Sequence, residues 1–160
     1  MNAPPERARA TVMGIVGSGG FDRAMEHFSS LGGEALLLDP DMVCGREHVL
    51  SALMHAERAF AAGSNRSKSL LTETVIYAAG DRQINRASER MRPKPGRGDM
   101  VAVLFGIPDP RLGDAGMSRD DSVMDASPAK AARLGVEPAD GMSCADLVLE
   151  HVAMVDLMKM

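Results

Sequence analysis

The sequence predicts an α/β fold of the α+β kind, with a mixed or antiparallel sheet flanked by helices. Segments typical of strands and of helices alternate along the 160 residues, and no repeat or linker separates them. The hydrophobic fraction of 45% is enough for one buried core. Residues 1–10 lack the apolar stretch of a signal peptide and are predicted to be a flexible tail. Residues 11–160 are predicted to form a single domain.

The first part of the chain is predicted to hold two strands and two helices. Residues 11–16 form a strand that ends at a glycine run, and residues 21–31 form a helix that Gly32 and Gly33 end. Residues 35–38 form a buried strand. Residues 45–62 are the clearest helix. Its apolar stripe consists of Val49, Leu53, Ala56 and Phe60.

The middle of the chain is also predicted to contain both strands and a helix. Residues 70–79 contain β-branched residues and a tyrosine, which favours a strand. A helix is predicted over residues 82–92 and a buried strand over residues 100–105.

Further along, residues 107–117 are predicted to be loop and residues 122–124 a short strand. Ser127 and Pro128 are typical of a helix start, here of a helix to residue 134. Ser143 begins a last helix that runs close to residue 158, with Asp146 placed to complete a capping box.

Composition sets limits on compartment. No run of about 18 apolar residues is present, so no membrane span is predicted. Cys44 and Cys144 are far apart and neither lies in a CxxC pair. We expect two small buried thiols rather than a disulfide, in a cytoplasmic protein.

Charge is unevenly distributed. The net charge is −4, yet residues 66–97 hold eight basic and three acidic residues, a net charge of +5. Arg82, Arg86 and Arg90 are spaced four apart, which places them on one ridge of a helix. This segment either binds phosphate groups or is a solvated helix face.

Local motifs of catalysis and of cofactor binding are absent from the sequence. The glycines at 17–20 match neither the dinucleotide-binding nor the P-loop pattern and favour a tight turn. His48 and His55 are seven residues apart, unlike zinc ligands on a helix, and all four histidines are expected at the surface or partly buried. No nucleophile motif is present. We therefore expect no catalytic residue, no metal and no cofactor.

A block in the middle of the chain resembles a known family. Asn65-Arg66-Ser67-Lys68-Ser69, then Glu73, then Tyr77 and Gly80-Asp81-Arg82-Gln83-Ile84 are similar to the hallmark of the kinase-binding (TPRKB-like) small subunit of the KEOPS complex, archaeal type. The resemblance extends over about residues 35–160, and more weakly over residues 11–34. Residues 107–117 depart from it, because they carry prolines and glycines where the family has a helix.

The resemblance implies a protein without activity of its own in tRNA threonylcarbamoyladenosine biosynthesis. Its partners would be the kinase-like ATPase subunit of the complex and tRNA, which it would capture by the 3′ CCA end and deliver to the threonylcarbamoyl transferase subunit. Two alternatives stay open. The chain could be a small nucleotide- or metabolite-binding enzyme that uses the Gly17–Gly20 loop, or an interaction module without tRNA binding.

The family motif and the helical spacing nominate site residues. For tRNA, the motif matches Arg66, Lys68 and Arg82, with Gln83 as a hydrogen-bonding partner, and the helical spacing adds Arg86 and Arg90. Alternatively, Lys68 and Arg82 pair with Glu73 or Asp81.

For the kinase, the last helix is apolar nearly all round, which is typical of a docked or a buried helix. Its candidate contact residues are Val148, Val152, Val155 and Leu157. The alternative is that this helix packs wholly on the chain's own sheet.

Overall fold

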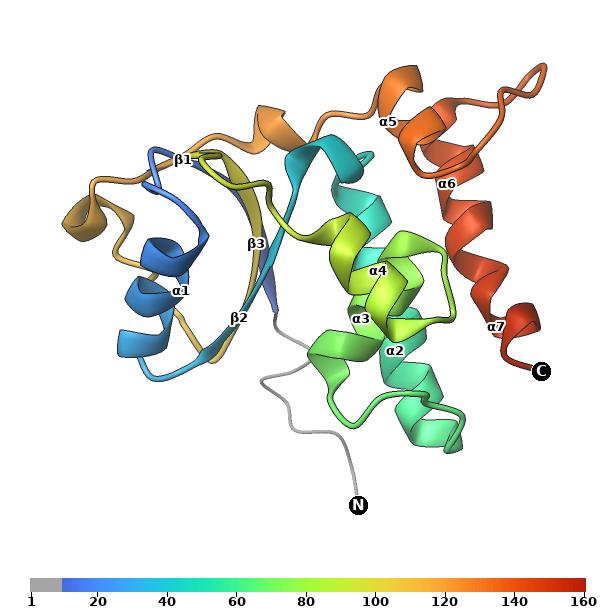
Figure 1. The fold of residues 1–160 in the computed structure, drawn as a ribbon, viewed down its shortest axis with the longest axis horizontal. Coiled ribbons are helices and arrows are strands. Elements are labelled where there is room, and N and C mark those ends of the chain that lie inside the picture. Colours follow the sequence, from blue (N-terminus) through green and yellow to red (C-terminus); the bar gives the residue numbers. More distant parts are fainter. Residues whose placement is uncertain (1–9) are drawn as a thin grey trace. The chain divides into compact units, whose positions relative to one another are not determined.

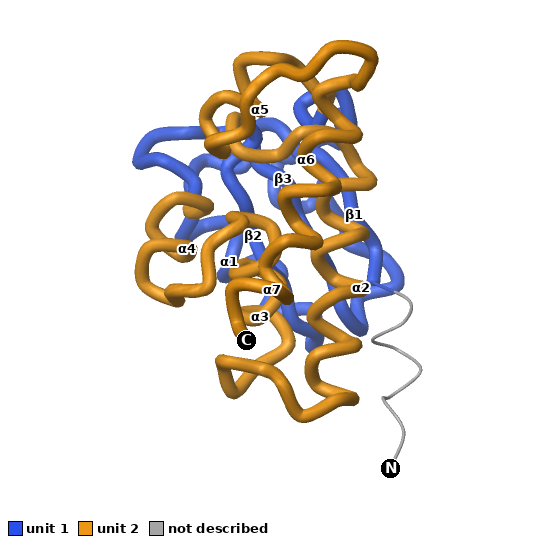
Figure 2. The backbone as a smooth tube through the Cα atoms, turned by 90° about the vertical axis from the view of Figure 1, so that its right-hand side faces the viewer, with its two compact units in different colours: residues 1–40, 93–124 blue, residues 41–92, 125–160 orange. Residues whose placement is uncertain are grey.

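A computed structural model describes residues 10–160 (Figure 1). The tail predicted for residues 1–10 lies outside the described residues except for its last position. The chain divides into two compact units (Figure 2). The sheet unit comprises the residues up to Pro40 and residues 93–124, and the helical unit comprises residues 41–92 and 125–160. The single domain over residues 11–160 stays a prediction, and each unit is described by itself.

The sheet unit is an antiparallel sheet with a helix on one face. Its strands lie in the order β2-β3-β1-β4, and every neighbouring pair is antiparallel. The bounds of its elements are β1 Thr11–Val16, α1 Phe21–Ser30, β2 Glu34–Leu38, β3 Met100–Phe105, η3 Leu112–Ala115, β4 Ser118–Arg119 and η4 Asp121–Met124, the η elements being 3-10 turns. The α+β class and the antiparallel sheet are thereby confirmed.

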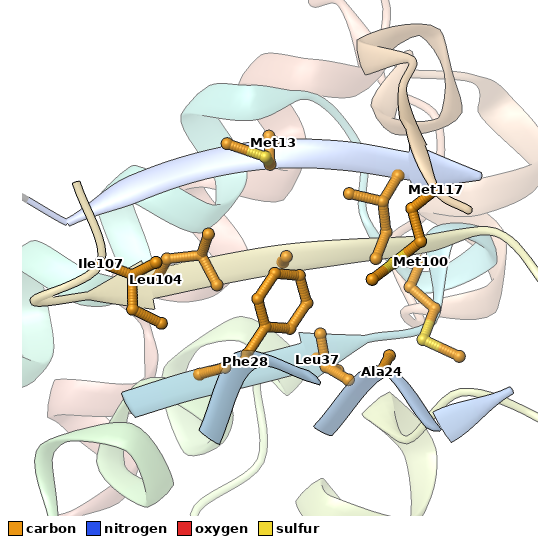
Figure 3. Packing of buried hydrophobic residues seen from close by; sticks show 11 residues of the cluster. Met13, Ala24, Phe28, Leu37, Met100, Leu104, Ile107 and Met117 are labelled. Carbon is orange, nitrogen blue, oxygen red and sulfur yellow. The ribbon is translucent and has the colours of Figure 1, made fainter. Parts of the chain in front are cut away.

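The core of the sheet unit lies between α1 and the sheet. Successive side chains of a strand point to opposite faces, so every second residue of β1, β2 and β3 faces the helix. Phe28 and Ala24 of α1 are wholly buried against this face (Figure 3). The strand residues of the cluster are Met13, Ile15, Ala35, Leu37, Met100, Ala102 and Leu104.

The helical unit is built around α3, which packs against α2, α4 and α6. The bounds of its helices are α2 Arg46–Ala62, α3 Leu70–Ala79, α4 Ile84–Met91, α5 Pro128–Arg133, α6 Cys144–Ala153 and α7 Val155–Met158, and the short turn η2 Pro40–Met42 precedes α2. The predicted starts of α5 and α6 are confirmed, because the hydroxyls of Ser127 and Ser143 cap them. Within residues 10–160, every helix is too short or too polar to cross a membrane.

Residues 70–79 form helix α3, so the strand predicted there was wrong. Their β-branched and aromatic composition favours a strand, but both ends specify a helix. The Ser69 hydroxyl accepts a hydrogen bond from the Thr72 amide over 3.1 Å, and Gly80 ends the helix at φ 68°. Eight of the ten residues are buried, which is typical of a helix enclosed on all sides.

The strand predicted at residues 122–124 was also wrong, because these residues belong to η4. The carboxylate of Asp120 accepts hydrogen bonds from the amide and the hydroxyl of Ser122, at 3.0 and 2.6 Å. Such a side-chain-to-backbone bond two residues on closes a turn and removes the amide from strand pairing. Gly14 of β1 allows η4 to lie close, since a Cβ there would be 2.2 Å from the Asp120 carbonyl oxygen.

Candidate functional site

The loop that precedes α3 is anchored to a buried carboxylate. The backbone amides of Arg66 and Ser67 donate to Glu73 over 3.0 and 2.9 Å, and the Ser67 hydroxyl donates to it over 2.9 Å. Glu73 is fully buried on α3, while the side chains of Arg66 and Lys68 are exposed. The loop therefore has a fixed course that presents two cations to solvent.

The Glu73 carboxylate has a fourth partner, the ammonium group of Lys159. Burial alone would raise the pKa of Glu73, but the hydrogen bonds from Lys159 and Ser67 outweigh it and lower that pKa. The Lys159 ammonium also lies 3.0 Å from the Tyr77 hydroxyl and 4.5 Å from the centre of its ring. A residue just after α7 is thus held against α3.

Tyr77 extends this polar cluster one helical turn further. Its hydroxyl donates to the carboxylate of Asp156 in α7, and Nδ1 of His55 lies 3.1 Å from the same carboxylate. The His55 ring stacks on the Tyr77 ring with centroids 5.3 Å apart. Burial raises the pKa of Tyr77, and the charges of Asp156 and Glu73 raise it further. Side chains of α2, α3 and α7 together fix the last turn.

Two of the predicted tRNA-contacting arginines meet the backbone of this last turn. The guanidinium of Arg66 donates to the carbonyl oxygen of Lys159 over 2.9 Å, and that of Arg82 donates to the carbonyl oxygen of Met158 over 2.9 Å. Both side chains are otherwise exposed. The structure therefore brings Arg66 and Arg82 to one place, where they share the end of α7 as a support.

The alternative pairings weighed for Lys68 and Arg82 are not the ones found. Glu73 pairs with Lys159 instead of Lys68, and Asp81 pairs with Arg86 instead of Arg82. Among the described residues, the Lys68 ammonium contacts no carboxylate. Its charge is therefore available to a ligand.

The remaining predicted tRNA contacts lie along α4. Gln83 is the N-cap of this helix, and its side chain accepts a hydrogen bond from the Arg86 amide over 2.7 Å. The Arg86 guanidinium donates to Asp81 over 2.8 and 2.9 Å, and these bonds lower the pKa of Asp81. Arg90 donates to the carbonyl of Arg133 over 3.1 Å. Arg82 precedes α4, so the predicted ridge is helical only from Arg86 to Arg90.

The predicted kinase contacts on the last helix separate into buried and exposed residues. Val148, Val152 and Val155 are each 0% exposed, whereas Leu157 is 58% exposed. The three valines fill the interior of the chain and present no surface to a partner, which corrects that part of the prediction. The apolar side chains that this region does expose are Met154, Leu157, Met158 and Met160.

His48 was expected at the surface or partly buried, and this expectation was wrong, since it is 1% exposed. Its Nδ1 accepts a hydrogen bond from the Cys44 amide over 3.0 Å, so its Nε2 carries the proton and donates to the Ala78 carbonyl over 2.8 Å. Burial lowers the pKa of His48 to about 4. His48 therefore joins the start of α2 to α3 as a neutral ring.

Gly80, in the family motif, has a packing role that the sequence did not reveal. A Cβ on it would lie 2.1 Å from Nε2 of His151, which has no hydrogen-bond partner among residues 10–160. The close approach of α6 to the end of α3 therefore requires a glycine. No local pattern signals it, because the two residues are far apart in the chain.

Two backbone amides of the glycine loop before α1 donate hydrogen bonds within the sheet unit. The Ser18 amide donates to the Gly98 carbonyl over 3.0 Å, and the Gly20 amide donates to the Ser18 hydroxyl over 3.2 Å. Both amides are thus occupied, unlike those of a phosphate-binding loop. In residues 10–160, no three His, Cys, Asp or Glu side chains lie together as metal ligands. No observation favours the alternative of a nucleotide-binding enzyme.

The part of the chain that contains this site is similar to a known protein family. A family model described as kinase binding protein CGI-121 matches residues 24–131, more than half of the chain. The match includes every predicted tRNA-contacting residue and ends before α6, which begins at Cys144. A search of curated proteins finds no match.

Proposed function

The chain belongs to the CGI-121 family of kinase-binding proteins, and on this premise we propose that it is a non-catalytic subunit of a KEOPS-type complex. It docks on the kinase-like ATPase subunit and captures tRNA by the 3′ CCA end, for use by the threonylcarbamoyl transferase subunit. The observation that carries the tRNA half is the anchored loop, in which Glu73 fixes the backbone beneath Arg66 and Lys68.

Fixed cations suit a phosphate ligand. A guanidinium has five N–H donors, and one contact of Arg66 and one of Arg82 go to the end of α7. Both arginine side chains are exposed, and so is Lys68, which adds a third charge two residues after Arg66. Charge-assisted hydrogen bonds to phosphate oxygens are stronger than neutral ones and carry no sequence preference. The site is therefore suited to the backbone of a single-stranded end.

Binding of intact tRNA and of tRNA trimmed of its CCA end, each at two salt concentrations, tests this half. The expected result is salt-sensitive binding to intact tRNA that weakens when the end is removed, because phosphate contacts release counterions. The double variant Lys68→Glu/Arg82→Glu should lose this binding. The control is Arg58→Glu/Arg111→Glu, which changes the net charge equally at two exposed residues outside the basic segment.

The outcomes separate three explanations. Loss of binding in both double variants would point to overall charge alone and would contradict a site at Lys68 and Arg82. Absence of binding by the unaltered chain would leave an interaction module without tRNA binding. Binding that is indifferent to the CCA end would contradict capture by that end while keeping the basic site.

The kinase-binding part of the proposal is supported by the apolar side chains exposed after α6. Met154, Leu157 and Met158 are 47%, 58% and 36% exposed, and exposed apolar groups close together are typical of an interface. Methionine adapts its shape to a partner. We place the docking surface on these side chains rather than on the three buried valines.

Co-purification with the kinase-like subunit tests this surface. Leu157→Asp should abolish the association while leaving the unfolding midpoint of the chain unchanged, because the side chain is exposed. Met142→Asp is the matched control, since Met142 is also an exposed apolar residue (39%) but lies before α6. Association retained by Leu157→Asp and lost by Met142→Asp would move the interface to the loop before α6.

A further inference from the structure

The two cysteines of the chain lie together in the helical unit. Cys44 stands just before the N-cap of α2, and Cys144 is the first residue of α6. Both thiols are free. Burial raises the pKa of the Cys44 thiol, and the Cys144 thiol raises it further.

Contacts of the start of α5 support the same placement. Sγ of Cys44 lies 3.7 Å from the carbonyl oxygen of Ser127. The next residue, Pro128, lines a cavity of about 190 Å³ together with Cys144. The cavity wall is otherwise formed mainly by apolar side chains, among them Ala131, Val136, Met142 and Leu147. The start of α5 therefore lies beside both cysteines.

The two thiols differ in accessibility. Cys44 is 1% exposed, and burial raises its pKa. Cys144 is half-buried at the cavity wall, so a small oxidant can reach it. The positive charge of Lys130 acts on Cys44 and lowers its pKa in part.

We propose that Cys144 and Cys44 are a redox modification site that a peroxide converts reversibly to a disulfide. The Cys144 thiolate attacks one peroxide oxygen, the O–O bond breaks, and the released hydroxide takes up a proton to become water. The Cys144 sulfenic acid is then attacked by Cys44. The S–S bond forms, the S–O bond breaks, and the oxygen leaves as a second water with the Cys44 proton.

The electrons balance in this sequence, because two thiols are oxidised to one disulfide and one peroxide is reduced to two waters. A low-molecular-weight thiol reverses it. The bond would join the start of α2 to the start of α6, both within the helical unit. Closing a loop of this length restricts the unfolded chain and should raise the midpoint of thermal unfolding by about 5–10 °C.

Alkylation and mass spectrometry of the full chain test the proposal. After treatment with hydrogen peroxide, we expect the mass of the chain to fall by two hydrogens and the chain to take up no alkylating reagent. Digestion should then give two peptides linked through residues 44 and 144. Dithiothreitol should restore both alkylation sites. The assignment is unambiguous, since the chain has only two cysteines.

Single variants assign the order of the two steps. In Cys44→Ser and Cys44→Ala, Cys144 should accumulate a sulfenic acid that dimedone traps. In Cys144→Ser, Cys44 should stay reduced at the same peroxide dose. Thermal unfolding of each reduced variant checks that it is folded, and the two substitutions of the buried Cys44 guard against the failure of one.

Two results would overturn the proposal. The first is an oxidised chain in which both cysteines still take up the alkylating reagent. The second is a disulfide found only between two copies of the chain, because the two sulfurs of one chain are then not close enough to react.

Discussion

The main cores of the two units contain different kinds of side chain. Eleven apolar residues fill the space between α1 and the sheet, and this cluster contains no ionisable side chain. The helical unit instead buries His48 and Glu73, each with all its polar contacts matched inside the unit. The stability of an apolar interior depends on the apolar area that folding removes from water. The stability of a polar interior depends on each buried polar or charged group keeping its hydrogen-bond or ion-pair partner.

This difference indicates where the chemistry of the chain lies. The buried Glu73 supports the loop of Arg66 and Lys68 from below and holds Lys159 at the same time. The sheet unit also buries a carboxylate, that of Asp39, which pairs with Lys94 and Arg97, but Asp39 lies outside the apolar cluster between α1 and the sheet. We therefore expect pH, acting through His48, and polar substitutions around Glu73 to affect the helical unit, and loss of apolar volume between α1 and the sheet to affect the sheet unit.

The largest effect is expected for Phe28→Ala in the sheet unit. Phe28 is fully buried, so removing its ring costs about 3–5 kcal/mol in the free energy of unfolding. Urea unfolding at neutral and at acidic pH measures it. The loss should be the same at both pH values, and a strong pH dependence would contradict a purely apolar core. Met25→Ala, at a partly buried position of the same helix, should cost less.

The next effect is expected for Lys159→Met in the helical unit. The substitution leaves the Glu73 carboxylate buried without its cation, which costs about 3 kcal/mol of unfolding free energy. Adding Glu73→Gln should recover part of this loss, because the buried charge is then gone. Lys68→Met removes an exposed ammonium and serves as the control. A loss as large for Lys68→Met as for Lys159→Met would argue against the buried pair.

Acidification should weaken the helical unit through His48. The pKa of its buried ring is lowered from 6.5 to about 4, so the unfolded chain binds the proton more readily between these pH values. The stabilisation is fully present above about pH 6.5 and is lost as the pH falls to 4, by at most about 3 kcal/mol. Urea unfolding across this range measures the slope. His48→Gln cannot titrate, and a slope that persists in this variant would assign the effect to another group.

The smallest effect comes from a pair of glycines that end helices. Gly80 and Gly63 both have the left-handed conformation, with φ 68° and 73°, but only Gly80 faces a side chain. Gly63→Ala should cost about 1 kcal/mol for backbone strain alone. Gly80→Ala should cost about 2 kcal/mol, because the new methyl group meets His151. The difference should shrink in Gly80→Ala/His151→Ala, and equal losses for both single variants would contradict the contact.

Much of the fold could be predicted from local patterns. The apolar stripe of α2, the buried strands at 11–16 and 100–105, and the serine caps of α5 and α6 depend on residues close in sequence. Helix α3 could not be predicted in this way, because its composition favours a strand while its enclosure by α2, α4 and α6 is a long-range fact. Its caps, Ser69 and Gly80, were the local signal that could have identified it.

The candidate site could be predicted only in part. The motif located Arg66, Lys68 and Arg82, but no pattern links Glu73 and Tyr77 to residues more than 75 positions later in the chain. For the last helix, the sequence showed apolar residues on nearly all sides. Which stripe faces inward depends on the packing of α6 against α2 and α3, so Val148 and Val152 could not be distinguished from the exposed Leu157.

The fluorescence of Tyr77 makes changes in the polar cluster measurable. The chain has one tyrosine and no tryptophan, so its tyrosine emission comes from a single ring and is not masked by tryptophan. That ring stacks on His55, lies under Lys159 and shares a hydrogen bond with Asp156 of α7. Release of the last turn would change the surroundings of this ring, and the unlabelled chain would report it as a change in emission when a partner binds beside Arg66 and Arg82.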